Sequence, residues 1–220
     1  MRQVGIYGGS FNPIHYGHLR SAIEVREEMG LDEIWMIPSH KPPHKASSEM
    51  AASSDRLAML ELAIDGVEGL RAEPIELERS DPSYSIETLR LLRQRNPETN
   101  FQWILGFDAF CELHTWYQYE SLLPECDFIV TTRPPRSIER GANPEALAAM
   151  PIAVREGLCY DETIECHVRE GGRRLTFVPV TALNISASAL RASLARGRSP
   201  RFLLPDPVLE YIESQSLYRG

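Results

Sequence analysis

The sequence predicts an α/β fold, in which a doubly wound parallel sheet is followed by a small C-terminal helical part. Short apolar runs alternate with segments whose apolar residues recur at helical spacing, the pattern of repeated βα units. Residues 34–37 are apolar at every position, as expected for a strand buried on both faces. The chain has 220 residues, of which 43% are hydrophobic, enough for one α/β domain with a substantial core.

The first half of the chain contains the clearest elements. Residues 4–7 form the first expected strand, and the helix that begins near His18 ends at Gly30, a residue type typical of helix ends. After a loop rich in Pro and Ser, Ser54 and Asp55 begin a second helix. We further expect strands over 34–37, 73–78, 101–105 and 128–131, and a helix around 86–92.

The alternation weakens in the second half. Residues 137–174 are rich in Gly, Pro and scattered charge, and we expect a candidate insertion there with one helix at 144–150. A strand over 175–178 and a helix over 186–194 follow, and Asp206 and Pro207 supply the N-cap and first turn of a last helix. We therefore expect a single domain over 1–220, with 186–220 as its C-terminal helical part.

Charge and cysteine usage narrow the class of protein. The formal net charge of −8 argues against a general nucleic-acid-binding protein. The four cysteines form no CxxC pair, Met1 leads directly into a strand without room for a signal peptide, and no apolar run is long enough to span a bilayer. We expect a cytoplasmic protein with reduced cysteines and with no nucleic-acid or membrane partner.

The most informative segment is GGSFNPIHYGH at residues 8–18, directly after the first expected strand. Glycines let a ligand approach bare backbone, and a helix N-terminus attracts anions. His15 and His18 stand there, where imidazoles can donate hydrogen bonds to a phosphate. The segment contains neither GxGxxG nor GK[ST], so it is neither a dinucleotide fingerprint nor a Walker loop. A structural turn with surface histidines and a zinc site are the other interpretations of these residues.

A second segment with phosphate-binding chemistry lies far along the chain. In ISASALR at residues 185–191, Ser186 and Ser188 open a helix whose N–H groups can meet phosphate. Arg191 adds a permanent charge that binds phosphate in a forked geometry. Both segments follow expected strands, and ligands of parallel sheets bind beyond the carboxyl ends of the strands.

These two segments resemble the signatures of the nucleotidyltransferases with an HxGH motif. Within that superfamily the chain is similar to the bacterial nicotinate-nucleotide adenylyltransferases. Four further segments carry the likeness: PPHK at 42–45, PSYS at 82–85 with Thr88, GFD at 106–108 and TWY at 115–117. The likeness runs from residue 4 to about 133 and from 177 onward, and it implies a Rossmann-like fold.

The resemblance implies transfer of the adenylyl group of ATP to nicotinate mononucleotide, a step of NAD biosynthesis that releases pyrophosphate. It implies that His15 and His18 are catalytic, and that Mg²⁺ is carried by the ATP phosphates without a metal site on the protein. The implied ATP-binding residues are Gly8, Gly9, Ser10, Phe11, Gly106, Asp108, Arg133, Ile185, Ser186 and Arg191. The implied residues for nicotinate mononucleotide are His44, Lys45, Tyr84, Ser85, Trp116 and Tyr117.

Other functions stay open at this stage. The acceptor of the same chemistry could be nicotinamide mononucleotide, phosphopantetheine or glycerol phosphate, although a flat ring stacking on Trp116 favours a pyridine nucleotide. A nucleotide-binding sensor without turnover is a second alternative. A metal-binding protein using His15, His18, His40 and His44 is a third. The sequence defines neither the oligomeric state nor the preference between nicotinate and nicotinamide.

Overall fold

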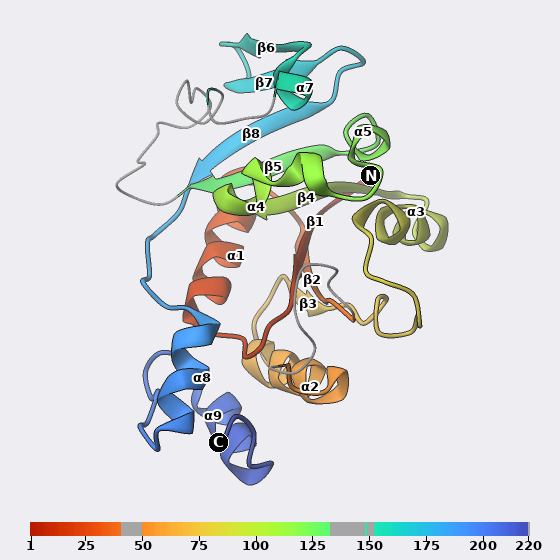
Figure 1. Cartoon of the computed structure of the whole chain (residues 1–220). Coiled ribbons are helices and arrows are strands. Elements are labelled where there is room, and N and C mark those ends of the chain that lie inside the picture. The colour runs from red at the N-terminus through yellow and green to blue at the C-terminus, as the bar shows by residue number, and fades with distance from the viewer. Residues whose placement is uncertain (41–49, 133–147, 149–151, 220) are drawn as a thin grey trace.

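The computed structural model describes residues 1–40, 50–132, 148 and 152–219, and these residues form an eight-stranded sheet covered by helices (Figure 1). The strands are β1 Arg2–Gly9, β2 Glu33–Pro38, β3 Leu70–Ala72, β4 Thr99–Gly106, β5 Asp127–Thr132, β6 Leu158–Asp161, β7 Cys166–Arg169 and β8 Arg174–Pro179. The helices are α1 Tyr16–Met29, α2 Ser53–Ile64, α3 Ser85–Arg95, α4 Phe107–Cys111, η2 Leu113–Thr115, α5 Tyr119–Leu122, α7 Ile152–Arg155, α8 Ala187–Ala195 and α9 Asp206–Ser214.

The strand order is β3-β2-β1-β4-β5-β8-β7-β6. Every neighbouring pair from β3 to β8 is parallel, whereas β7 is antiparallel to both β8 and β6. The chain runs outward from β1 to β3 on one side and outward from β4 on the other, so the direction of winding reverses between β1 and β4. In sheets of this kind the reversal opens a crevice at the carboxyl ends of the two central strands.

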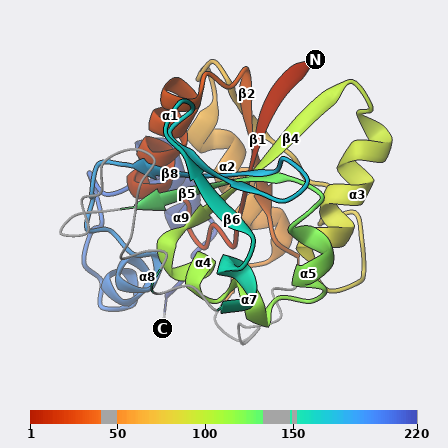
Figure 2. The same cartoon turned by 90° about the horizontal axis from the view of Figure 1, so that it is seen from above.

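Two apolar layers hold the helices against the sheet. On β4, Phe101, Trp103 and Leu105 point into the layer that contains side chains of α3, α4 and α5. Ile104 points the other way, into the layer that contains side chains of α1, α2, α8 and α9. Side chains of a strand alternate between its faces, and the views of Figures 1 and 2 show helices on both sides of the sheet. This confirms the predicted doubly wound Rossmann-like fold.

Local sequence signals explain several element boundaries. Gly30 ends α1 in the left-handed conformation, with φ of 59°, as its position in the sequence predicts. Ser186 caps α8, because its Oγ accepts a hydrogen bond from the Ala189 N–H at 3.2 Å. Asp206 is the first residue of α9 rather than its cap, which is Pro205.

One expectation about the strands was wrong. Residues 73–78 form a turn and not a strand, because β3 ends at Ala72 and the chain then folds back with a 2.7 Å hydrogen bond from the Leu77 N–H to the Pro74 carbonyl. The charged and apolar residues alternate there as in a strand, but Pro74 has no N–H for a sheet ladder. Within residues 137–174, β6 and β7 add an antiparallel edge to the parallel strands. The helix predicted at 144–150 lies, except for residue 148, outside the described residues.

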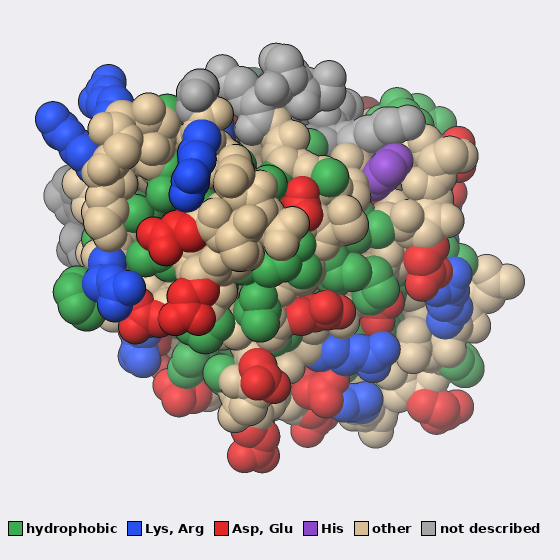
Figure 3. Space-filling view, turned by 90° about the horizontal axis from the view of Figure 1, so that it is seen from below, with side chains coloured by type: hydrophobic (Ala, Val, Ile, Leu, Met, Phe, Trp, Pro, Cys, Tyr) green, Lys and Arg blue, Asp and Glu red, His purple; other side chains and the backbone are tan. Residues whose placement is uncertain are grey.

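The helices, the cysteines and the surface charge bear on the expectations from the sequence. Over the described part of the chain, no helix combines the length and the apolar character needed to cross a membrane. No disulfide joins the four cysteines, all of which the structure describes. On the face shown in Figure 3, acidic and basic side chains are scattered without one continuous patch of either sign.

Candidate active site at the carboxyl edge of the sheet

The turn after β1 brings bare backbone to the crevice between β1 and β4. Gly9 ends β1, and a Cβ there would lie 3.0 Å from the Phe11 ring, so any larger residue would press against this ring. Phe11 is buried with φ of 42°, in the left-handed region that bulky residues rarely adopt. Such a conformation persists only where the surroundings hold it in place.

The two histidines of the motif form a stacked pair at the start of α1. His15 is the N-cap residue and is only 3% exposed, while His18 is half-buried. Their ring centroids are 3.7 Å apart, with 27° between the planes. A Cβ on Gly17 would lie 3.0 Å from Cε1 and Nδ1 of His15, so the glycine of the motif leaves the room that this imidazole occupies.

Aromatic rings connect the histidine pair to a cavity. The Phe11 ring contacts the His18 ring edge to face, with centroids 5.3 Å apart. The Tyr7 ring also lies edge-on to His18, with centroids 6.5 Å apart. Tyr7 also lines a cavity of about 230 Å³. The predicted site residues that line this cavity are Gly8, Gly9, Ser10, Tyr84, Ser85, Gly106, Trp116 and Tyr117. The structure therefore brings together residues that the sequence places up to about a hundred positions apart.

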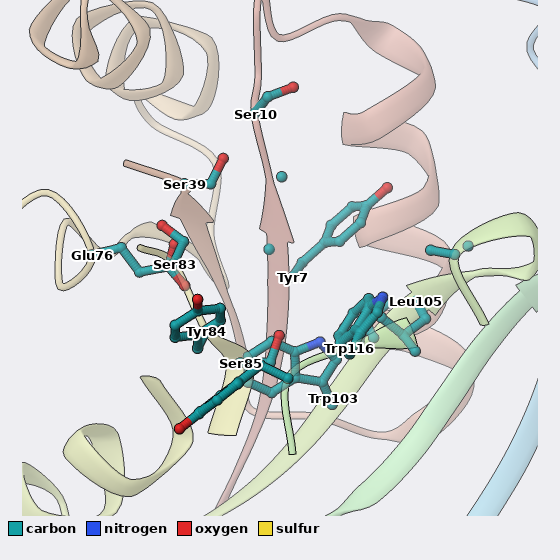
Figure 4. Close-up of a pocket in the computed structure, with 16 residues that line it drawn as sticks. Tyr7, Ser10, Ser39, Glu76, Ser83, Tyr84, Ser85, Trp103, Leu105 and Trp116 are labelled. Carbon is teal, nitrogen blue, oxygen red and sulfur yellow. The ribbon is translucent and has the colours of Figure 1, made fainter. Parts of the chain in front are cut away.

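Aromatic side chains form much of the cavity wall. Figure 4 shows Glu76, Ser83 and Tyr84 on one side and Tyr7, Trp103 and Trp116 on the other. The Tyr84 and Tyr117 rings stack, with centroids 4.2 Å apart and 28° between the planes. A flat ligand ring is the natural occupant of such a space, since aromatic groups gain most from offset or edge contacts with one another.

The N-terminus of α3 opens onto the same cavity. Ser85 is the first residue of this 11-residue helix, and both Ser85 and the N-cap Tyr84 line the cavity. The first N–H groups of a helix have no partner inside the helix, and the helix dipole favours negative charge beside them. This end of the cavity suits an anionic group such as a carboxylate.

Glu76 is a lining residue that the sequence analysis missed. Its side chain is 8% exposed, and its Oε1 accepts a hydrogen bond from the Thr88 hydroxyl at 2.8 Å. Burial raises the pKa of the Glu76 carboxyl above its ordinary value, and hydrogen bonds from Ser83 and Thr88 oppose that rise. The reading of residues 73–78 as a strand concealed this residue, because the turn is what points Glu76 inward.

The second predicted signature packs against the turn after β1. Arg191 of α8 donates from Nη1 to the Asn12 carbonyl at 3.0 Å. Ile185 lies nearby, since a Cβ on Gly17 would be 3.9 Å from the Ile185 Cβ. Segments at the two ends of the sequence thus meet at the N-terminus of α1, and the exposed Ser186 begins the helix that carries Arg191.

The remaining predicted site residues lie at the rim or outside the described part. Asp108 is exposed in the first turn of α4, directly after the lining residue Gly106. His44, Lys45 and Arg133 fall outside the described residues, so their predicted contacts stay predictions. Within the part of the chain that the structure covers, no three His, Cys, Asp or Glu side chains gather where they could hold a metal ion.

Comparison with known proteins agrees with this geometry. The family model described as cytidylyltransferase-like matches residues 6–193. The protein named "Probable nicotinate-nucleotide adenylyltransferase" from Pseudomonas aeruginosa strain PAO1 is 40% identical over 221 residues, covering 100% of this chain and 98% of its own length. The proteins of the same name from Pseudomonas putida strain W619 and Desulfatibacillum aliphaticivorans are 43% and 41% identical, covering 100% and 98% of this chain and 96% and 99% of their own lengths.

Solved structures show the same fold at lower sequence identity. The Plasmodium falciparum nicotinic acid mononucleotide adenylyltransferase complexed with NaAD superposes with a TM-score of 0.75 at 20% identity, covering 99% of this chain and 98% of that chain. The same protein complexed with APC gives a TM-score of 0.71 with the same coverage. The similarity therefore extends over the sheet, both helical layers and the C-terminal helices.

Proposed function

We infer that this chain, which belongs to the cytidylyltransferase-like family and within it to the nicotinate-nucleotide adenylyltransferases, transfers the adenylyl group of ATP to nicotinate mononucleotide. The products are nicotinate adenine dinucleotide and pyrophosphate, so the reaction is a step of NAD biosynthesis. One feature of the structure supports this reaction most directly. A glycine turn with two histidines, suited to phosphate, opens beside an aromatic cavity suited to a flat ring.

The chemistry needs positioning and charge stabilisation rather than a base. The phosphate of the mononucleotide is already an anion, and it attacks the α-phosphorus of ATP while the bond to the leaving pyrophosphate breaks. We assign His15 and His18 as donors to the α-phosphate oxygens, with the backbone of residues 8–11 lining the same place. Arg191 and the N-terminus of α8 would hold the pyrophosphate. Gly106, Asp108 and Ile185 would surround the remainder of ATP.

We place the nicotinate ring in the aromatic cavity. The ring would lie against Trp116 and the stacked Tyr84 and Tyr117. Its carboxylate would accept hydrogen bonds from backbone N–H groups at Ser85, in the first turn of α3, and at Tyr117. Backbone donors around the carboxylate favour the acid over the amide, whose NH₂ would face those same donors. His44 and Lys45 would reach the phosphate or ribose of the mononucleotide.

A divalent metal ion generally assists phosphoryl and nucleotidyl transfer, and we propose Mg²⁺ here. Mg²⁺ keeps several waters and commonly binds through substrate phosphates with one or two carboxylates. This suits a site whose described residues offer His15, His18 and Arg191 as hydrogen-bond donors and the exposed Asp108 as a rim carboxylate. A cytoplasmic location and the absence of nucleic-acid and membrane partners stay predictions from the sequence.

A comparison of acceptors with ATP tests the proposal. Pyrophosphate release is measured with nicotinate mononucleotide, nicotinamide mononucleotide and phosphopantetheine in parallel. We expect the highest kcat/KM with nicotinate mononucleotide, and a clear loss with the amide, because a buried donor left facing another donor is costly. A higher kcat/KM with phosphopantetheine would overturn the acceptor, and binding of ATP without release of pyrophosphate for any acceptor would indicate a sensor instead.

A further inference from the structure

Hydrogen bonds from three distant parts of the chain hold the turn between β1 and α1. Arg56 of α2 is completely buried and donates from Nη1 to the Ser10 carbonyl at 2.8 Å. Arg191 of α8 donates to the Asn12 carbonyl at 3.0 Å. Tyr218, which follows α9 in the chain, donates from its hydroxyl to Oδ1 of Asn12 at 2.7 Å. Two of these side chains carry charge, and the third is a neutral phenol.

Two of these three hydrogen bonds, those from Arg191 and Tyr218, converge on Asn12. Its side chain is 3% exposed, and its Oδ1 also accepts the Ala51 N–H at 3.0 Å. Asn12 directly follows Phe11, whose left-handed backbone must be held in place by its surroundings. It precedes His15, the first of the two stacked histidines, by three residues. A shift of Asn12 would therefore move both the backbone that lines the phosphate site and the start of α1.

The segment after α9 is folded so that Tyr218 reaches Asn12. Ser216 and Tyr218 both adopt left-handed φ values, 54° and 59°, in place of a straight continuation of the helix. The ring packs against the apolar layer of α1, α2, α8 and α9. Burial raises the pKa of the Tyr218 hydroxyl, although Arg191 and Arg56 lie close enough to oppose the rise, so the phenol stays protonated and able to donate. In Figure 1 the C-terminus lies beside α9, and α8 lies next to the start of α1.

We propose that Tyr218 is a positioning residue of the adenylyl-transfer site, which acts by fixing Asn12 and thereby the turn and the histidine pair. The inference rests on the proposed function, because it assigns the turn to phosphate. Its consequence is that the hydroxyl of Tyr218, although it lies outside the lining of the cavity, supports turnover more than it supports binding of the acceptor.

The chain supplies a matched control. Tyr211 of α9 is half-buried like Tyr218, and its hydroxyl also donates a hydrogen bond, to Oδ1 of Asp55 on α2 at 3.0 Å. Tyr211→Phe therefore removes an equivalent hydrogen bond between the C-terminal region and α2 without touching the turn. Tyr218→Phe keeps the ring and removes only the donor to Asn12.

The experiment measures pyrophosphate release and thermal unfolding for the wild type and both variants. We expect kcat of Tyr218→Phe to fall roughly 2- to 10-fold, the factor that corresponds to one neutral hydrogen bond. We expect an almost unchanged KM for nicotinate mononucleotide and an unfolding midpoint close to that of Tyr211→Phe, which keeps the wild-type kcat. In an Asn12→Ala background, Tyr218→Phe should add little, because the two residues act as one unit.

Two results separate the possible failures. A wild-type protein that releases no pyrophosphate would overturn the proposed function, and this inference with it. An active wild type with an unchanged kcat in Tyr218→Phe, or an equal fall in both tyrosine variants, would overturn the positioning role alone.

Discussion

The turn after β1 and the aromatic cavity beside it are built in opposite ways. Phe11, Asn12 and His15 of the turn are almost completely buried, and distant side chains bind its backbone. Most rings of the cavity wall are less buried: Tyr84 and Trp116 are half-buried and Tyr117 is 48% exposed, although Trp103 is buried. On the proposed function, the chemistry common to all adenylyl acceptors would belong to the fixed, backbone-lined part. Recognition of one acceptor would belong to surface side chains that can change without disturbing the fold.

The largest expected effect comes from removing a donor of the fixed part. We expect His18→Ala to lower kcat by roughly 10²–10³-fold, the cost of losing one preorganised donor to a developing charge. Steady-state pyrophosphate release measures this. His114→Ala is the control, because His114 is exposed and lies outside the cavity lining. A near-normal kcat in His18→Ala would mean that the histidine pair does not act on the α-phosphate.

Substitutions in the aromatic cavity should change KM for nicotinate mononucleotide and leave kcat nearly unchanged. We expect Trp116→Ala to raise KM for nicotinate mononucleotide roughly 10-fold, since aromatic stacking contributes on the order of 1 kcal/mol. KM for ATP should change little, because the change leaves the turn intact. Trp116→Phe keeps a ring and should recover most of the loss. An equal rise of both KM values in Trp116→Ala would remove the division between the two regions.

The smallest effect concerns stability and Glu76. Its pKa is raised by burial, so between the ordinary Glu pKa and the raised value the folded state binds more protons than the unfolded state. The contribution of Glu76 to the free energy of unfolding therefore falls as pH rises through that window. Glu76→Gln removes the charge, and its stability relative to wild type should rise between pH 5 and pH 8.

Urea unfolding of wild type and Glu76→Gln at the two pH values measures this change. Glu73, whose pKa burial also raises, is present in both proteins and cancels in the difference. A difference in stability that is the same at both pH values would show that Glu76 is not a buried carboxylate of raised pKa.

Elements with a strong local pattern could be predicted from the sequence. The apolar run of β2, the spacing of Ile86, Leu89 and Leu92 on α3, and Gly30 at the end of α1 are each specified by neighbours in the chain. The parallel order of the central strands follows from repeated βα units, and with it the meeting of the motifs at one edge. The glycine turn and its two histidines could be recognised for the same reason.

Features that depend on contacts between distant residues could not be predicted. The buried Arg56 is an ordinary surface residue by its local pattern, and its burial becomes clear only from contacts such as the hydrogen bond to Ser10, 46 positions away. Tyr218 lies 206 positions from the asparagine it contacts. Residues 73–78 show the converse error. Their alternating pattern predicts a strand, but β3 ends at Ala72 and Pro74 has no N–H to donate to a neighbouring strand.

The short hairpin of β6 and β7 has a consequence for the behaviour of the protein at high concentration. A central strand such as β8 that lost its outer neighbour would present a row of unpaired peptide groups, onto which another polypeptide could add and start aggregation. β7 covers part of that row, through the pairs His167–Leu175 and Val168–Arg174, and the outermost strand β6 is only four residues long. An edge strand this short offers little template for another polypeptide to add to the sheet.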